Sequence, residues 1–274
     1  MDVQNFSALA SVYIKENPQF LDLALNSLVN QSLQASEVVL VHDGPLTSDL
    51  YEVIAKYKNK LPLKEVVLKE NLGLGKALNA GLEQCTHDLV ARFDTDDINR
   101  SNRFELQIEQ FTNDTELVAC SSYVEEFDVV PHDTGSIKKL PLSNSDICNY
   151  AKYRNPFNHM AMMFRKQAVI DSGSYMHLHF MEDYYLWLRL ISRKYKCLNL
   201  EDVLVDARVG SGMYGRRKGL KYIHSEYELY KIHKGLGLLN YTQRIFSLII
   251  RIIPRLLSTG MLKRVYLTLR SKRV

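Results

Sequence analysis

Short apolar runs rich in β-branched residues alternate with amphipathic stretches through the first third of the chain, and this alternation most constrains the fold. The runs at 8–14 and 38–41 predict buried strands. Between them, Asn17 followed by Pro18 predicts a helix start, because asparagine caps helices and proline fits the first turn. The same reasoning predicts helices at 48–60 and 74–84 and strands at 64–68 and 88–93. Strands and helices that alternate at this pitch predict an α/β fold with a mainly parallel central sheet flanked by helices.

The second half of the chain is less regular but shows no repeat and no linker. A strand is expected at 118–127, a loop or hairpin at 131–142, a short helix capped by Ser143, and a helix at 181–193 with Trp187 on its inward side. We therefore expect one domain over residues 1–220, with residues 221–274 as an appended helical tail.

Composition excludes several classes of protein. The chain has 274 residues, of which 46% are hydrophobic, so it can bury a large core. Its four cysteines are far apart with no C-x-x-C pair, which argues against a zinc site or a disulfide framework and fits a reducing cytosol. The polar N-terminus argues against a secretory signal, and the lack of a long apolar run argues against an ordinary transmembrane helix.

The net charge of +4 is unevenly distributed along the chain. Residues 229–274 carry ten basic residues and no acidic one, so the rest of the chain is acidic overall. Such asymmetry indicates that the two parts meet different partners.

The sharpest motif is Asp94-Thr95-Asp96-Asp97, directly after a predicted strand. Three carboxylates so close together repel one another unless a cation neutralises them. Hard divalent ions such as Mn²⁺ or Mg²⁺ bind one or two carboxylates together with substrate phosphate oxygens. The alternative is a solvated acidic loop that caps the helix expected near Asn99.

Two further motifs lie at predicted strand ends or helix starts. Asp43 precedes Gly44 and Pro45 and could accept hydrogen bonds from a nucleobase or a ribose, although Asp-Gly is also a common turn. The glycine-rich segment 71–81, with Lys76, could present backbone N–H groups and a cation to an anion, or could be an ordinary helix start.

Candidate catalytic residues occur later in the chain. Glu182 and Asp183 begin a helix, where a carboxylate could act as a general base or simply favour the helix N-terminus. The basic, glycine-rich segment 208–218 could be a flap over a phosphorylated ligand or a solvated loop. His159 could face an acceptor or be a structural histidine.

Taken together, these motifs resemble family 2 glycosyltransferases with the GT-A fold, and most closely bacterial enzymes of O-antigen and amylovoran-type exopolysaccharide assembly. The matching segments lie in the family's order at residues 11–13, 27–31, 41–44, 71–81, 91–97 with Arg103, 155–165 and 181–187. The chain departs from the family's pattern at His42, where the family often has aspartate, and at Leu78, where it often has arginine. Arg208 is also not followed by a histidine of the sort that some relatives use as an extra metal ligand.

The resemblance implies a role for individual residues. Asp96 would be the main metal ligand, supported by Asp94 and Asp97, and Asp183 would be the catalytic base, oriented by Glu182. The residues implied to bind the donor are Ser11, Tyr13, Asp43, Lys76, Asn79, Arg92 and Asp94. Those implied to face the acceptor or to form a flap are His159, Trp187, Arg208, Arg216 and Arg217.

The implied reaction is metal-dependent and inverting. It moves a hexose from a UDP-sugar to an N-acetylhexosamine on a lipid pyrophosphate, with glucose or galactose and a β-1,3 linkage favoured. Two alternatives stay open, a sugar nucleotidyltransferase and a non-catalytic sugar-nucleotide-binding scaffold. The first would normally carry a basic, glycine-rich loop after the first strand, which residues 11–20 lack.

The basic tail, residues 221–274, indicates where in the cell the protein acts. Within residues 241–253, four apolar residues share one helical face, namely Ile245, Leu248, Ile249 and Ile252. The basic residues Arg244, Arg251 and Arg255 lie together on another face. Basic amphipathic helices suit the anionic inner leaflet, so we expect a peripheral protein on the cytoplasmic face of the inner membrane. The alternative is a helix packed on the domain with a solvated basic face. Nucleic acid is not an expected partner, because the apolar face is too large.

Overall fold

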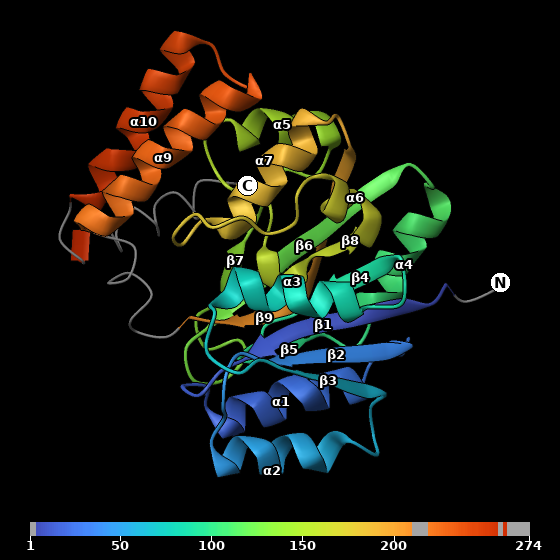
Figure 1. Ribbon diagram of the computed structural model, residues 1–274. Coiled ribbons are helices and arrows are strands. Elements are labelled where there is room, and N and C mark those ends of the chain that lie inside the picture. The colour runs from blue at the N-terminus through green and yellow to red at the C-terminus, as the bar shows by residue number, and fades with distance from the viewer. Residues whose placement is uncertain (1–3, 210–218, 257–259, 262–274) are drawn as a thin grey trace.

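The computed structural model describes residues 4–209, 219–256 and 260–261. Its first half follows the predicted alternation of strands and helices (Figure 1). The elements are β1 (Phe6–Val12), α1 (Pro18–Val29), β2 (Glu37–His42), α2 (Ser48–Tyr57), β3 (Leu63–Val67), α3 (Leu74–Gln84) and β4 (Leu89–Arg92). Asn17 caps α1 as expected, since its side chain accepts a hydrogen bond from the Gln19 N–H.

The second half contains elements that the sequence predicted and others that it did not. Its elements are β5 (Ile98–Asn99), α4 (Arg103–Asn113), β6 (Leu117–Phe127), β7 (Ser136–Lys138), α5 (Asn144–Ala151), a 3-10 turn (His159–Ala161), β8 (Met163–Arg165), α6 (Lys166–Asp171), α7 (Glu182–Ser192) and β9 (Lys196–Arg208). The expected hairpin is the β6–β7 pair, and Ser143 caps α5 as expected. Sequence analysis missed the short β5 and β8, the short helix α6 and the long β9. It also placed the start of α4 too early, because β5 occupies the position expected for that helix.

All the strands in the described part of the chain belong to one nine-stranded sheet in the order β3-β2-β1-β4-β8-β6-β9-β5, with β7 paired to β6. The β3-β2-β1-β4 half is parallel, and the long β6–β9 pair is parallel as well. The short β8 and β5 pair antiparallel with their neighbours. The mainly parallel α/β sheet is therefore confirmed, with antiparallel strands inserted in its second half.

Helices cover both faces of the sheet, as Figure 1 shows with α1 and α2 on one side and α3 on the other. Leu9 and Val41 pack with residues of α3 and α7, whereas Ala8 and Leu40 pack with residues of α1, α2 and α4. Alternate residues of the strands thus serve opposite cores, as expected for a sheet buried on both faces.

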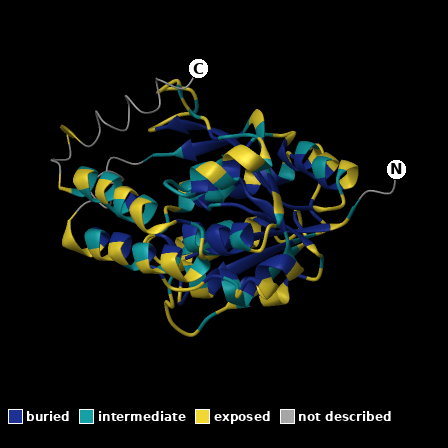
Figure 2. Ribbon diagram, turned by 90° about the horizontal axis from the view of Figure 1, so that it is seen from above, coloured by how far each residue is buried: buried dark blue, intermediate teal, exposed yellow. Residues whose placement is uncertain are grey.

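The C-terminal helices α9 (Leu220–Leu236) and α10 (Tyr241–Arg255) lie side by side, and α9 packs against α7 (Figure 1). Figure 2 shows exposed positions along both helices, in contrast to the largely buried centre of the molecule. None of the described helices is long and apolar enough to cross a membrane.

Candidate active site

Three neighbouring parallel strands end at one edge of the sheet, and predicted site residues lie in or directly after each of them. Ser11 lies in β1, paired with Val41 of β2, and Tyr13 follows the end of β1. Asp43 follows β2, and Asp94 lies just beyond β4. The topology therefore brings the predicted donor-binding residues together where ligands bind in open α/β sheets.

Residues 94–97, the acidic loop, form a compact cluster of carboxylates. One oxygen from each of Asp94, Asp96 and Asp97 lies within 4.8 Å of the others. A fourth carboxylate, Glu16, accepts a hydrogen bond of 2.6 Å from the Thr95 hydroxyl, a contact that sequence reasoning did not foresee. Carboxylate oxygens are the ligands that Mg²⁺ and Mn²⁺ prefer, so this donor set fits such an ion.

Burial and mutual repulsion destabilise the ionised form of the acidic loop. Burial, together with the charges of Asp94 and Glu16, raises the pKa of Asp96 to about 7. The pKa of Asp97 is raised well above its ordinary value, again by burial first and then by Asp96 and Asp94. A bound cation would relieve this repulsion, since it favours the ionised carboxylates.

Two buried arginines lie beneath the acidic loop. Arg92 is 1% exposed and forms a two-pronged ion pair with Asp94. Arg103 is fully buried and donates to the carbonyl oxygens of Arg92 and Met162. Burial and the neighbouring Arg92 lower the pKa of Arg103 to about 9. The structure thus places Arg92 as an internal counter-charge to Asp94.

Arg208, predicted to lie on a flap, instead holds the acidic loop at the end of β9. Its backbone N–H donates to Asp97 Oδ1 over 2.7 Å, and its Nε donates to the Asp96 carbonyl oxygen. Its guanidinium lies 3.8 Å and 4.4 Å from the ring centroids of Phe20 and Phe127. Arg216 and Arg217 lie outside the described residues.

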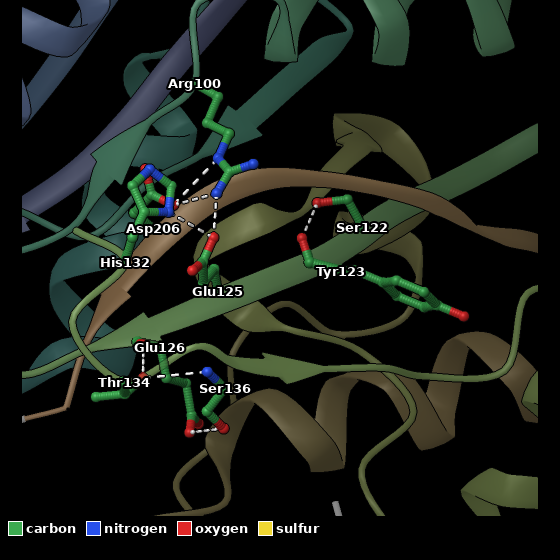
Figure 3. Close-up of polar contacts among 9 residues, drawn as sticks. All are labelled: Arg100, Ser122, Tyr123, Glu125, Glu126, His132, Thr134, Ser136 and Asp206. Atoms are coloured by element: carbon green, nitrogen blue, oxygen red, sulfur yellow. Dashed lines mark hydrogen bonds and ion pairs between the residues drawn. The ribbon is translucent and has the colours of Figure 1, made fainter. Parts of the chain in front are cut away.

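A second acidic cluster lies close by but already contains its own cation. Arg100 Nη2 contacts Glu125 at 2.5 Å and Asp206 at 2.7 Å, and His132 Nδ1 lies 2.9 Å from Glu125 (Figure 3). Because Arg100 pairs with both carboxylates, this cluster already contains a cation that links the end of β5 to β6 and β9.

On the donor side of the edge, Asp43 orders the start of α3. Its two carboxylate oxygens accept the N–H groups of Leu72 at 2.6 Å and Gly73 at 3.0 Å. Asn79 exchanges two hydrogen bonds with the backbone of Tyr175, whereas Lys76 is exposed on the first turn of α3. Asp43 and Asn79 therefore hold backbone segments of the site in place. Lys76, in contrast, presents an exposed cation at the start of α3.

The predicted base lies at the N-terminus of α7, beside α3. A Cβ placed on Gly75 would lie 3.5 Å from Glu182 Cγ, so the first turns of the two helices are in contact. Arg92 and Tyr175 each interact electrostatically with both Asp94 and Asp183. The structure therefore brings Asp183 to the same site as the acidic loop.

Asn155 is a site residue that sequence reasoning missed. Its Nδ2 donates to Asp183 Oδ2 over 2.6 Å, while its Oδ1 accepts the Phe157 N–H over 3.2 Å. The second bond fixes the orientation of the amide, so its NH₂ faces the carboxylate. Burial raises the pKa of Asp183, and hydrogen bonds from the Tyr184 N–H and Asn155 act in the opposite direction. Burial also raises the pKa of Glu182.

His159 and Trp187 belong to the packing beneath the site. Trp187 is fully buried, with its ring edge-on to Phe157 and His159. His159 Nε2 lies 2.9 Å from the Tyr175 hydroxyl, and burial lowers its pKa well below the ordinary value, so its ring is neutral. The predicted acceptor role of Trp187 is therefore not supported, and His159 holds Tyr175.

The family model described as "Glycosyl transferase family 2" matches residues 9–175, which include the acidic loop and the strand ends described above. This chain is a family 2 glycosyltransferase. The enzyme is 47% identical over 261 residues to the amylovoran biosynthesis glycosyltransferase AmsE of Erwinia amylovora, covering 95% of this chain and 97% of the relative. It is 41% identical over 265 residues to an Escherichia coli protein, covering 97% and 96% of the two chains. That relative is named UDP-Gal:alpha-D-GlcNAc-diphosphoundecaprenol beta-1,3-galactosyltransferase.

Solved structures place the enzyme in the GT-A fold. S. aureus TarS 1–349 matches with a TM-score of 0.67 at 20% identity, covering 92% of this chain and 71% of that one. The mannosyltransferase PcManGT of Pyrobaculum calidifontis, solved with GDP-Man and Mn²⁺, matches with a TM-score of 0.64 at 15% identity, covering 98% and 81%. The fold class and the hexosyltransferase activity predicted from sequence are confirmed. The family assignment therefore favours glycosyl transfer over the alternative of a sugar nucleotidyltransferase.

Proposed function

We propose that the enzyme transfers a hexose from a UDP-sugar to an N-acetylhexosamine carried on a lipid pyrophosphate, during O-antigen or exopolysaccharide assembly. The proposal rests on the arrangement at one sheet edge, where Arg92 pairs with Asp94 of the acidic loop and Gly75 of α3 lies beside both Glu182 and Tyr175, so that Asp183 lies near the same two side chains, Arg92 and Tyr175. The name of the E. coli relative favours galactose over glucose, a β-1,3 linkage, and undecaprenol as the lipid. The complexes of TarS with UDP-GlcNAc and with UDP support a uridine donor.

The acidic loop would hold the divalent ion of this reaction. The clustered oxygens of Asp94, Asp96 and Asp97 would bind Mn²⁺ or Mg²⁺, and the Mn²⁺ complex of PcManGT supports this choice. When bound, such an ion neutralises the charge that develops on a diphosphate leaving group.

The remaining chemistry belongs to side chains of the enzyme. Asp183 accepts the proton of the acceptor hydroxyl as its oxygen attacks C1 of the donor sugar and the bond from C1 to the phosphate oxygen breaks. UDP leaves with the electron pair, and the anomeric centre is inverted because the attack comes from the opposite face. A carboxylate is suited to this role because it needs only to be ionised and within hydrogen-bond reach of the hydroxyl. Asn155 holds it for that purpose.

A donor panel tests the proposal. The enzyme with Mn²⁺ is given UDP-galactose, UDP-glucose, UDP-N-acetylglucosamine or GDP-mannose, together with a synthetic N-acetylglucosamine-pyrophosphate lipid. We expect UDP release and a β-1,3-linked disaccharide with UDP-galactose. Binding of UDP-sugars without turnover of any donor would contradict the proposal and favour a non-catalytic scaffold.

The role of Asp183 is tested by substitution. We expect Asp183→Asn to lose transfer by a factor of about 10³ or more while UDP affinity changes little, because general-base catalysis contributes roughly 10²–10⁴-fold. The matched control is Asp202→Asn, an exposed aspartate on β9, which should leave turnover unchanged. Wild-type turnover by Asp183→Asn would show that another group is the base.

We further propose that this chemistry takes place on the cytoplasmic, anionic face of the inner membrane. The lipid-linked acceptor requires a membrane surface, and the ten basic residues of 229–274 favour an anionic one. The full-length enzyme should float with phosphatidylglycerol-containing vesicles and bind less tightly to phosphatidylcholine vesicles. Absence of binding to both would contradict this localisation.

A further inference from the structure

Among the described residues, the helix α10 carries an apolar face whose side chains are half or more exposed; one of them, Phe246, lies with its ring edge-on to Tyr153. We infer that this face, rather than the arginines of the helix, is the surface by which the enzyme enters a lipid interface. The inference rests on the proposed membrane acceptor. It also differs from the alternative that the sequence left open, a packed helix with a solvated basic face, because Arg251 and Arg255 face the protein.

The arginines of α10 are turned toward the protein. Glu226 of α9 has a fully buried side chain, and Arg251 Nε contacts its carboxylate at 2.5 Å. Arg255 Nη2 lies 3.1 Å from the other oxygen of the same carboxylate. Arg251 also donates to the Tyr153 carbonyl oxygen over 3.0 Å. These two cations are therefore held by internal partners and cannot be the groups that meet a membrane.

Because the ion pairs fix the rotation of α10, its opposite side faces solvent. We define the apolar stripe as Phe246, Ile249, Ile253 and Leu256, which are 57%, 50%, 55% and 69% exposed. Their spacing of three and four residues places them on one face of the helix. An apolar face of this kind is costly in water and marks an interaction surface.

The charge of the surrounding sequence identifies the occupant of the stripe. Lys231, Arg251 and Arg255 pair with Glu228 and Glu226. Residues 229–274 contain seven further basic residues and no acidic one, so a second copy of the segment would be repelled and an anionic surface attracted. Amphipathic helices that lie in a bilayer interface combine such an apolar face with nearby cations. The stripe therefore fits the headgroup and acyl boundary of an anionic bilayer.

Point variants of the full-length chain test this inference better than a truncation, which would expose the buried Glu226. The variant Ile249→Glu/Ile253→Glu should bind vesicles of phosphatidylethanolamine and phosphatidylglycerol at least about tenfold more weakly, because two exposed apolar side chains are lost from the interface. The milder Ile249→Ser/Ile253→Ser should weaken binding in the same direction. Ile249→Leu/Ile253→Leu should bind as the wild type does.

The matched control is Leu23→Glu, which changes a 44%-exposed leucine on α1 at the opposite end of the molecule (Figure 1). This control should bind vesicles normally. All variants should turn over a short-chain, water-soluble acceptor at the wild-type rate, which separates docking from catalysis.

Wild-type vesicle binding by both the glutamate and serine variants would overturn the inference while leaving the transferase proposal intact. It would also be overturned if the variants changed the mass of the protein in sedimentation without changing lipid binding, since a second copy would then cover the stripe.

Discussion

Asp96 is the carboxylate of the acidic loop that is best placed to bind an ion. Asp94 is engaged by Arg92, and Asp97 accepts the Arg208 N–H. Among the described residues, no other residue donates a hydrogen bond to the Asp96 carboxylate. The protein thus positions two carboxylates through its own partners and leaves the third for a ligand.

Substitution of Asp96 is therefore expected to remove the metal dependence of donor binding. We predict that Asp96→Ala weakens UDP binding in Mn²⁺ at least about tenfold, as loss of a metal ligand or its support typically does. Isothermal titration with UDP, in Mn²⁺ and in EDTA, measures the effect. The exposed Asp171→Ala serves as the control, and an unchanged ratio between the two titrations in Asp96→Ala would contradict the assignment.

Asn155 is expected to act on the pH profile of the reaction through Asp183. Its amide donates to the carboxylate and so favours the ionised form, which is the form that accepts a proton. Loss of this bond raises the pKa of Asp183. On acidification, the variant would therefore lose activity at a higher pH than the wild type does. Among the described residues, the charged or titratable groups that interact with Asp183 include Arg92, Lys138 and Tyr175 and its helix neighbours Glu182 and Tyr184.

We predict that Asn155→Ala shifts the acid limb of the kcat profile upward by about one unit, since a hydrogen bond to a charged group is worth roughly 1.5–3 kcal/mol. Asn155→Ser, which retains a donor, should shift it less. A lower kcat with an unmoved acid limb would mean that Asn155 only maintains local structure.

At the scale of elements, sequence reasoning succeeded where periodicity and capping were strong. The bounds of α3 were predicted at 74–84 and are Leu74–Gln84. It failed for β8 and β5, which are three and two residues long and owe their strand conformation to neighbours distant in sequence. The same limit applies to Asn155, because only tertiary structure reveals its contact with Asp183 across 28 positions.

The close contact of α3 with the sheet gives a prediction about stability. A Cβ on Gly81 would lie 2.5 Å from Leu9 Cδ1 and 2.6 Å from Val41 Cγ2, so even alanine overpacks this interface. We expect Gly81→Ala to lower the free energy of unfolding by about 1–3 kcal/mol, measured by urea denaturation. The control is Gly235→Ala in α9, where no atom lies within 4 Å of the added Cβ. It should stabilise the protein by about 0.5–1 kcal/mol, because alanine favours a helix interior. Equal effects at the two glycines would contradict the packing argument.

At the scale of the whole molecule, Arg251 connects α10 to the start of α7. The Arg251 guanidinium lies 5.1 Å from the ring centroid of Tyr184, the residue that follows Asp183 on α7. Its Nη2 also contacts the Met181 sulfur at 3.7 Å. Since Arg251 joins α10 to the start of α7, we expect the orientation in which the apolar stripe would meet a bilayer to affect the orientation of the proposed base toward a lipid-linked acceptor.

The proposed metal site also predicts how ligands stabilise the whole molecule. The acidic loop connects β4 with β9 through Arg208, so an ion and UDP bound there should stabilise the folded state and not the unfolded chain. Ligands at 100 times their Kd contribute about 2.7 kcal/mol. At roughly 2–4 °C per kcal/mol for a chain of this size, the Tm should rise by several degrees. We expect this rise with Mn²⁺ and UDP together and little with UDP in EDTA, measured by differential scanning fluorimetry. Asp96→Ala should abolish the difference between the two conditions, whereas an equal rise in EDTA would show that UDP binds without the ion.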